Sequence, residues 1–317
     1  MDNCNVNSPL PLLEVENLSM HFTTKRRGKK NTVKAVNDVS FKVYPGETFG
    51  LVGESGCGKT TTGRTVIRLY DPTGGSVRFD GRVISGKMTP ELRRYITDNV
   101  AMIFQDPIAS LNPRMTVQEI IGEGLKIRGI TDEAQRYDMI IDMLQRVGLQ
   151  EEHATRYPHE FSGGQRQRIG IARALVVKPK LVIADEPVSA LDVSVQAQVI
   201  NLLNQLKQDL GLTILFIAHN LSVVKYFSDR VGVMHEGKLV ELADSKELFQ
   251  NPTHPYTKAL MSAIPQPEPR SERNRQHIYY DAQSHGYSKE NSPSYHEVSS
   301  GHMIYCSDEE LQRFQQE

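Results

Sequence analysis

The sequence predicts an α/β fold in which a parallel sheet flanked by helices is joined to an antiparallel β subdomain and an α-helical insertion. Continuously apolar runs are typical of strands buried on both faces of a parallel sheet. This chain has three such runs, at residues 49–52, 181–184 and 214–218. Alternating apolar and polar residues are typical of antiparallel strands with one solvated face. Three segments alternate in this way, around Leu13 and Val15, around Val39, Phe41 and Val43, and around Val77 and Phe79.

The helical insertion is expected between about residues 107 and 175. Thr116 and Glu119 have the spacing of a capping box, which opens a helix. Beyond it, apolar residues recur three and four positions apart, as on one helix face; they are Tyr137, Ile140, Ile141, Leu144 and Val147. Alternating prolines at residues 265–269 predict a semi-rigid linker. We therefore expect a main domain over residues 1–264 and a C-terminal linker and tail over residues 265–317.

Composition excludes several classes of protein. The net charge of −1 lacks the strong positive charge that is typical of nucleic-acid-binding proteins, so no nucleic-acid partner is expected. No apolar run approaches the roughly 18 residues that span a bilayer, and residues 1–10 lack a signal-peptide pattern. Three scattered cysteines, Cys4, Cys57 and Cys306, argue against a disulfide framework or a zinc site. A basic cluster at residues 25–30 is interpreted as a solvated hairpin loop, with contact to lipid headgroups as the alternative.

A phosphate-binding loop follows the apolar run at 49–52. Residues 53–60 read GESGCGKT and fit the pattern G-x-x-x-x-G-K-[ST]. Small residues let backbone N–H groups converge on one point, and together with the N-terminus of the next helix they bind polyphosphate. In this pattern Lys59 reaches the β- and γ-phosphates and the Thr60 hydroxyl ligates Mg²⁺. The predicted nucleotide ligands are Gly53, Ser55, Gly56, Gly58, Lys59, Thr60 and Thr61. The pattern leaves position 57 free, so Cys57 is interpreted as a small filler.

Two acids end the apolar run at 181–184, where residues 181–186 read LVIADE. In a P-loop NTPase the first, Asp185, would hold Mg²⁺ through its water shell. Glu186 could accept the proton of an attacking water. An acid pair after a strand is weak evidence alone, but the upstream phosphate loop makes it strong. ATP and Mg²⁺ are therefore the expected cofactors.

A third motif lies shortly before these acids, where residues 161–168 read FSGGQRQR. By itself it predicts a flexible turn that opens a helix, a further anion-binding position. In this order the motifs resemble those of the ABC ATPase family, whose signature reads LSGGQ; here Phe161 replaces the leading Leu. The resemblance covers about residues 12–265. It implies a P-loop NTPase (RecA-like) core with an antiparallel β subdomain and an α-helical signature subdomain.

The resemblance also assigns roles to single residues. It implies that Phe22 lies under the adenine, although a core residue at a strand end is the alternative reading. It implies that Gln105 senses Mg²⁺ as a catalytic residue and metal ligand, and that His219, a catalytic residue like Glu186, contacts the γ-phosphate. The resemblance further implies a head-to-tail dimer in which some residues complete the nucleotide site of the partner subunit. These are the signature residues Ser162, Gly163, Gly164 and Gln165, and Asp192 of the D-loop.

Residues 251–257, NPTHPYT, resemble the hallmark of the oligopeptide/dipeptide/nickel importer branch. Physically they form a proline-stiffened turn with no expected catalytic role. Residues 161–175 and 188–203 resemble the F-type ATPase of this branch, which partners a sister D-type ATPase; a homodimer is the alternative. The resemblance implies two membrane permease subunits, an indirectly acting extracytoplasmic peptide-binding protein, and a peripheral location on the cytoplasmic face of the membrane. With only Cys306 near the C-terminus, the four-cysteine iron–sulfur cluster of some members is not available.

The implied function is ATP hydrolysis that powers peptide import. A GTPase would need an N-K-x-D motif, which is absent, and a chromosome-maintenance ATPase would need a long coiled coil. A small-molecule kinase has no reason to carry the FSGGQ segment. A regulatory ABC ATPase, and an importer of nickel or another small solute, stay open as alternatives.

Overall fold

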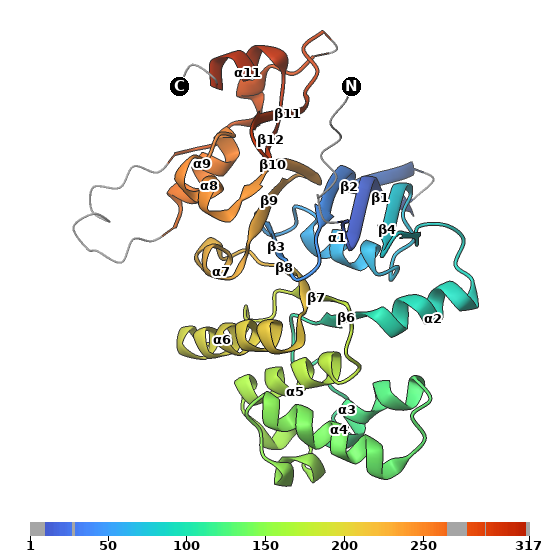
Figure 1. Cartoon of the computed structure of the whole chain (residues 1–317). Coiled ribbons are helices and arrows are strands. Elements are labelled where there is room, and N and C mark those ends of the chain that lie inside the picture. Colours follow the sequence, from blue (N-terminus) through green and yellow to red (C-terminus); the bar gives the residue numbers. More distant parts are fainter. Residues whose placement is uncertain (1–9, 27–28, 265–277, 289, 315–317) are drawn as a thin grey trace, which may run out of the picture. The chain divides into compact units, whose positions relative to one another are not determined.

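The computed structural model describes residues 10–26, 29–264, 278–288 and 290–314 (Figure 1). Contacts divide the chain into two compact units. The first comprises Met1–Glu14, Lys42–Glu47 and Arg78–Ile217, and the second comprises Val15–Phe41, Thr48–Val77 and Ala218–Glu317. In the described part of the chain, none of the helices combines the length and the apolar character needed to cross a membrane. The linker predicted at residues 265–269 and Cys4 lie outside the described residues.

The first unit contains three parallel strands in the order β8-β7-β6. They are β6 (Val100–Ile103), β7 (Leu181–Asp185) and β8 (Thr213–Ile217). Every residue of β7 and β8 is buried, which confirms the strands predicted from the apolar runs at 181–184 and 214–218. Because the strands are parallel, the residues that follow β6 and β7 leave the sheet at the same edge. Gln105 follows β6 and Glu186 follows β7, so both residues are expected at this same edge of the sheet.

Helices make up the rest of the first unit. They are α2 (Pro90–Asn99), α3 (Val117–Ile127), α4 (Glu133–Arg146), η1 (Glu151–Thr155), η2 (Pro158–Glu160), α5 (Gly163–Leu175) and α6 (Val193–Leu210). The Glu119 carboxylate accepts hydrogen bonds from the backbone N–H and the hydroxyl of Thr116, at 2.7 and 2.9 Å, which confirms the predicted cap of α3. The face predicted for α4 is buried at Ile140 and Leu144 but wrong at Tyr137, which is 40% exposed. The Tyr137 hydroxyl donates to Glu151 instead, since a phenol can pack at a rim and keep its polar end hydrated.

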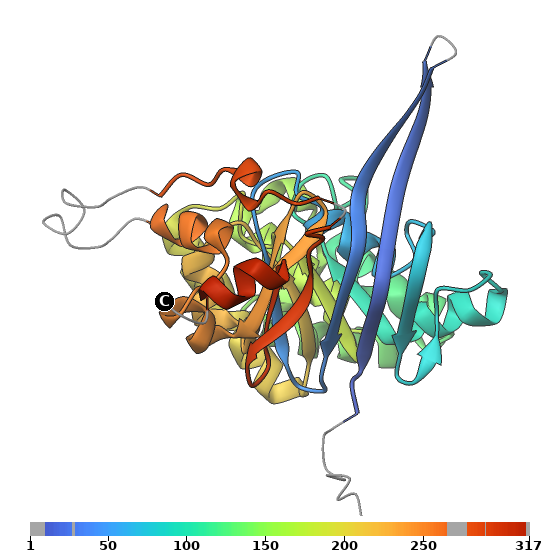
Figure 2. The same ribbon diagram turned by 90° about the horizontal axis from the view of Figure 1, so that it is seen from above.

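Antiparallel strands lie in the order β2-β1-β4-β5, and most of their residues belong to the second unit. They are β1 (Leu13–Arg26), β2 (Lys29–Val43), β4 (Gly74–Phe79) and β5 (Arg82–Val83). Figure 2 shows β1 and β2 running side by side as a long hairpin. The apolar residues of the alternating segments are buried, and Phe41 stacks on Phe49 with ring centroids 5.0 Å apart. The predicted antiparallel strands are therefore confirmed; residues 27 and 28 of the basic cluster lie outside the described residues.

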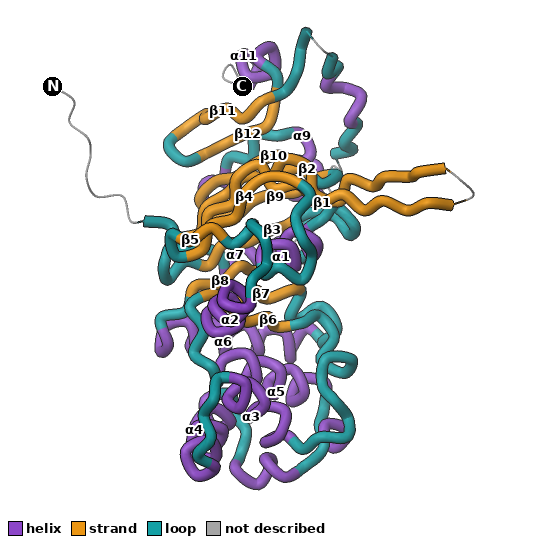
Figure 3. Tube along the Cα trace, turned by 90° about the vertical axis from the view of Figure 1, so that its right-hand side faces the viewer, coloured by secondary structure: helices purple, strands orange, loops and turns teal. Residues whose placement is uncertain are grey.

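The second unit also contains a mixed set of strands in the order β3-β9-β10-β12-β11 (Figure 3). They are β3 (Thr48–Val52), β9 (Arg230–His235), β10 (Lys238–Asp244), β12 (His302–Cys306) and β11 (Ser294–Ser299). The helices are α1 (Lys59–Val66), α7 (Leu221–Phe227), α8 (Ser245–Gln250), α9 (Pro255–Ser262), η3 (Ala282–His285) and α11 (Asp308–Phe314). Beyond the linker, no prediction for the structure of the tail came from the sequence; its strand β12 pairs with β10 and extends this set.

Candidate functional site

The phosphate loop joins the buried strand β3 to α1 in the second unit. Gly53 and Gly58 have φ values of 148° and 109°, which side chains other than glycine rarely adopt. A Cβ at Gly53 would lie 2.1 Å from the carbonyl oxygen of Met234, and one at Gly58 would lie 2.2 Å from that of Ala35. Only glycine fits these two positions, so the loop closes tightly against β9 and β2.

The Lys59 side chain folds back over this loop. It is only 4% exposed, and its ammonium donates hydrogen bonds to the carbonyl oxygens of Gly53 and Glu54, both at 2.8 Å. The first turn of α1, which lies wholly in the described part of the chain, contains no acidic residue. The positive end of the helix dipole and a buried ammonium therefore sit at one loop, an arrangement that favours a bound polyphosphate.

Two further predicted residues belong to the second unit. His219 is exposed and directly follows Ala218, whose backbone N–H donates to the carbonyl oxygen of Leu51 at 3.2 Å. This bond places His219 just past the end of β3, the strand that leads into the phosphate loop. Phe22 on β1 is exposed and meets the Tyr70 ring edge-on at 5.4 Å, so the alternative reading as a buried core residue is wrong.

The two acids after β7 differ sharply in environment. Asp185 is fully buried at the end of the strand, whereas Glu186 is partly exposed. Glu186 adopts a φ of 46°, an uncommon left-handed conformation for a residue other than glycine. Its backbone is held there because its N–H donates to the carbonyl oxygen of Ile217 and its own carbonyl accepts from the Ser189 backbone N–H. Backbone strain of this kind clusters at functional sites, where it can hold a side chain in one orientation.

Gln105 and Glu186 meet in the first unit. The Gln105 side-chain amide donates a hydrogen bond of 3.1 Å to a carboxylate oxygen of Glu186. The two residues are 81 positions apart in sequence, and parallel pairing of β6 with β7 brings them together. The contact orients the Glu186 carboxylate while the carbonyl oxygen of the Gln105 amide stays available as an acceptor.

The signature residues form the N-terminus of α5. Ser162 caps the helix: its hydroxyl accepts from the Gln165 backbone N–H at 3.3 Å, and the Gln165 side chain accepts from the Ser162 backbone N–H at 3.0 Å. Gly163 and Ser162 are exposed, while Phe161 is buried against His153, so the change from Leu keeps an apolar anchor. The next two residues of α5, Gly164 and Gln165, are partly exposed.

The signature lies beside the D-loop. A Cβ at Gly163 would contact Leu191 at 3.6 Å, and one at Gly164 would come within 2.6 Å of Val195. Asp192 is the exposed N-cap position of α6, and the next residue, Val193, is 81% exposed. Asp192 and Val193 are therefore exposed at the start of α6, close to the signature.

The oxygen ligands available fit Mg²⁺, which prefers hydroxyl, carboxylate and amide oxygens over nitrogen or sulfur. Thr60 in the first turn of α1 offers a hydroxyl, Asp185 a buried carboxylate and Gln105 an amide oxygen. Each of these three groups, taken by itself, is an oxygen ligand of the kind that Mg²⁺ accepts.

One contact of the phosphate loop escaped sequence reasoning. The backbone N–H of Glu54 donates to the hydroxyl of Tyr256, 202 residues later, at 3.1 Å. Tyr256 belongs to the NPTHPYT motif, so the motif itself was the available signal.

Alkylation of Cys57 is expected to inhibit ATP hydrolysis, but slowly at neutral pH. Burial raises the pKa of the Cys57 thiol against the opposing effect of Lys59, so little thiolate is present. Because thiolate is the nucleophile, the rate should rise about tenfold per pH unit below that pKa. The measurement is the rate of inactivation by N-ethylmaleimide at pH 7 and 8, and Mg-ATP should protect. Equal inactivation of Cys57→Ala would assign the effect to Cys4 or Cys306.

Two family models match the chain. The model described as ABC transporter matches residues 36–189, and the model described as Oligopeptide/dipeptide transporter, C-terminal region, matches residues 240–286. The first range contains the phosphate loop, the signature and both acids. The second contains the NPTHPYT motif and part of the tail.

Curated relatives match over nearly the whole chain. The chain is 56% identical over 304 residues to the oligopeptide transport ATP-binding protein OppF of Bacillus subtilis, covering 96% of this chain and 98% of that protein. It is 52% identical to the dipeptide transport ATP-binding protein DppF of Lactococcus lactis, covering 96% of each. Among solved structures, a dimeric post-hydrolysis state of the ATP-binding cassette MJ0796 with ADP and Pi has a TM-score of 0.66 and 27% identity, over 74% of this chain and 98% of that one.

Proposed function

Because the chain belongs to the ABC transporter ATP-binding family, in its oligopeptide/dipeptide branch, we propose that it hydrolyses ATP to power the import of peptides, with oligopeptides as the cargo. The observation that carries hydrolysis is the contact between Gln105 and Glu186, because it holds a carboxylate in a defined orientation at the edge of the parallel strands. The match to peptide-transport proteins along nearly the full length supports peptide as the cargo. Uptake of a labelled peptide by cells that lack the gene, with and without complementation, tests the proposal.

We assign the nucleotide contacts residue by residue. In the second unit, the phosphates would be bound by Gly53, Ser55, Gly56, Gly58, Lys59, Thr60 and Thr61, and Phe22 would contact the adenine. Thr60, Asp185 and Gln105 would each offer an oxygen ligand to Mg²⁺. When bound, Mg²⁺ would neutralise charge on the phosphate oxygens.

The chemistry assigned to the protein groups is a proton transfer. Glu186 accepts the proton of the attacking water, and Gln105 keeps the carboxylate oriented through its amide donor. His219 donates a hydrogen bond to the γ-phosphate and so stabilises charge that develops there. The left-handed backbone at Glu186 fixes this side chain before the substrate arrives, which reduces the reorganisation needed at the moment of reaction.

We further propose that two subunits close head to tail, with Ser162–Gln165 and Asp192 completing the nucleotide site of the partner. The exposure of the α5 N-terminus and of Val193 supports this arrangement. We propose a sister D-type ATPase as the partner and a peripheral position at the cytoplasmic face of the membrane. Two permease subunits would be contacted directly, and a peptide-binding protein would act outside the membrane. Copurification from native membranes identifies these subunits.

Replacing Ser162 with arginine is expected to abolish ATP-driven dimer closure while ATP binding by the monomer changes less than about twofold, because the signature serves the partner's nucleotide. Gel filtration with ATP in a Glu186→Gln background measures closure, and equilibrium titration measures monomer affinity. Ser162→Ala is the matched control. It loses the same helix cap, at a cost of about 1 kcal/mol, but adds no bulk or charge. If Ser162→Arg weakens monomer binding as much as Lys59→Ala does, the signature acts within its own subunit.

We also propose that residues 1–264 form the ATPase domain and residues 265–317 an appended C-terminal segment. The pairing of β12 with β10 joins this segment to the ATPase domain through the edge of one sheet.

A further inference from the structure

The NPTHPYT motif reaches the phosphate loop through one side chain. Tyr256, near the start of α9, is 2% exposed, and its hydroxyl accepts a hydrogen bond of 3.1 Å from the backbone N–H of Glu54. Burial raises the pKa of Tyr256 well above its usual range, so the hydroxyl stays neutral. Both residues belong to the second unit.

This contact acts on a peptide group that also binds Lys59. The N–H of Glu54 and the carbonyl of Gly53 belong to the same planar peptide unit and point in opposite directions. On one side the N–H donates to Tyr256; on the other the carbonyl accepts from the Lys59 ammonium at 2.8 Å. Gly53, with its φ of 148°, has the conformational freedom to let this plane rotate. The Tyr256 hydroxyl therefore sets the orientation of a carbonyl that holds the Lys59 ammonium.

Buried groups hold Tyr256 in place. A carboxylate of β10, Glu241, accepts hydrogen bonds from the backbone N–H groups of Thr253 and His254 at 2.7 and 3.1 Å. The His302 ring of β12 lies 2.8 Å from the same carboxylate. The His254 ring accepts from the Tyr256 backbone N–H at 3.1 Å. Burial lowers the pKa of His254 to about 3, so the ring is neutral and can accept this bond.

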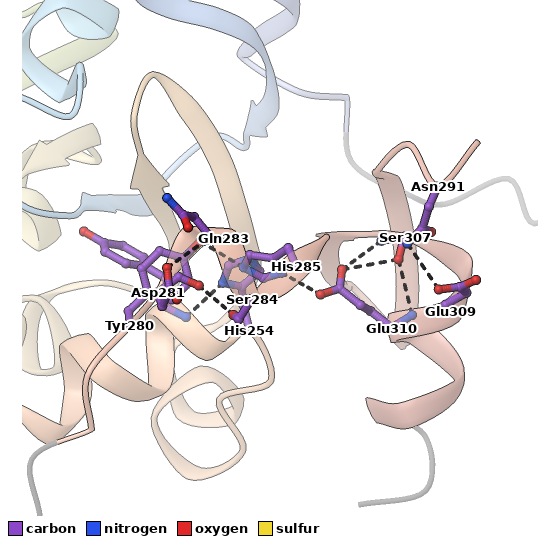
Figure 4. Close-up of polar contacts among 11 residues, drawn as sticks. His254, Tyr280, Asp281, Gln283, Ser284, His285, Asn291, Ser307, Glu309 and Glu310 are labelled. Atoms are coloured by element: carbon purple, nitrogen blue, oxygen red, sulfur yellow. Dashed lines mark hydrogen bonds and ion pairs between the residues drawn. The ribbon is translucent and has the colours of Figure 1, made fainter. Parts of the chain in front are cut away.

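One ring of β9 and one of the tail pack against the tyrosine. The Tyr256 ring contacts His235 at 4.1 Å and Tyr280 at 5.2 Å between centroids. Figure 4 shows the polar contacts that continue from here: the Tyr280 hydroxyl lies 2.9 Å from the His285 ring, which in turn lies 2.5 Å from Glu310 at the start of α11. The ring of Tyr256 is thus clamped on one side by the tail, so its hydroxyl has little freedom to leave Glu54.

We propose that Tyr256 is a positioning residue for ATP hydrolysis, which holds the Gly53–Glu54 peptide so that Lys59 is ready to receive phosphate. The inference rests on the proposed role of this loop in binding ATP. It gives the branch motif a task in the nucleotide site, where sequence reasoning expected none. Tyr256 acts through its contact with the loop and through Lys59, and has no assigned contact with the nucleotide itself.

The test compares Tyr256→Phe with Tyr280→Phe. Each change removes one hydrogen-bonded hydroxyl and keeps the ring, but of the two hydroxyls only that of Tyr256 contacts the loop. We expect Tyr256→Phe to raise the Kd and the KM for ATP about fivefold, the effect of one neutral hydrogen bond, with kcat nearly unchanged. Tyr280→Phe should lower the melting temperature about as much as Tyr256→Phe does. It should leave the affinity for ATP unchanged.

A KM for ATP in Tyr256→Phe equal to that of the wild type would overturn the inference, as would an equal loss in Tyr280→Phe, which would show general loosening of the core. Lys59→Ala is measured in parallel: if it binds ATP normally, the proposed role of the loop fails, and the inference with it. If Lys59→Ala loses ATP and Tyr256→Phe does not, the inference alone fails.

A measurement on the wild-type chain does not depend on how any variant folds. The amide hydrogen of Glu54 should exchange with solvent much more slowly than that of exposed Gly56 in the same loop, because only the former is bonded to Tyr256. Equal exchange rates of the two amides would show that the bond is not formed in solution and would overturn the inference.

Discussion

Glu186→Gln is expected to lower the rate of ATP hydrolysis by about 10² to 10⁴-fold while ATP stays bound, because an amide cannot accept the proton of the attacking water. The shape of the site should survive, since the oxygen of the new amide can still accept the hydrogen bond from Gln105. Phosphate release measured with the partner ATPase present gives the rate, and gel filtration with ATP detects the trapped closed dimer.

The matched control for this variant is Glu133→Gln, which makes the same chemical change at an exposed position in the first turn of α4. It should hydrolyse ATP at the wild-type rate. Gln105→Ala provides a second comparison, because it removes the group that orients Glu186 and should give an intermediate loss. Wild-type hydrolysis by Glu186→Gln would show that another group accepts the proton.

Lys59→Ala is expected to weaken ATP binding by about 10- to 100-fold, the effect of losing hydrogen bonds from a charged group to phosphate. If Lys59 faced solvent, this change would leave the melting temperature of the nucleotide-free chain unchanged. The structure does not meet this condition, because the side chain is 4% exposed and its ammonium bonds the carbonyl oxygens of Gly53 and Glu54. A lowered melting temperature of the nucleotide-free chain is therefore expected as well.

Two variants separate the packing of Lys59 from its charge. Lys59→Met keeps most of the apolar stem and removes the ammonium, so it should bind ATP as poorly as Lys59→Ala but be less destabilised. Lys30→Ala, at an exposed lysine of β2, controls for the loss of one positive charge and should bind normally. Isothermal titration and thermal melting measure the two effects. Tight ATP binding by Lys59→Met would show that the ammonium does not contact phosphate.

Features that depend on neighbouring residues were predictable from the sequence. The buried strands β7 and β8 follow from continuous apolar runs, and the antiparallel strands follow from alternation. The cap of α3 at Thr116 follows from spacing, since a capping box closes within one turn. The phosphate loop is of the same kind, because its shape depends on where glycine can adopt positive φ values over six residues.

Other features were not predictable because residues distant in sequence create them. Tyr137 has the right spacing for the buried face of α4 but lies at its rim beside Glu151. The tail shows no strong alternation, yet β12 finds a partner in β10. In both cases the position of a neighbouring element decides burial, which periodicity within one segment does not report.

By itself, the sequence determined the strand–loop–helix proposed to bind phosphate, the acids after β7 and the signature that opens α5, because each depends on residues close together in the chain. Only the tertiary structure decided that Gln105 meets Glu186 and that Tyr256 meets Glu54, across 81 and 202 residues. Such contacts depend on which strands pair and in what order. The planar Gly53–Glu54 peptide and the Glu186 carboxylate are then each oriented by a side chain that lies far away in the sequence.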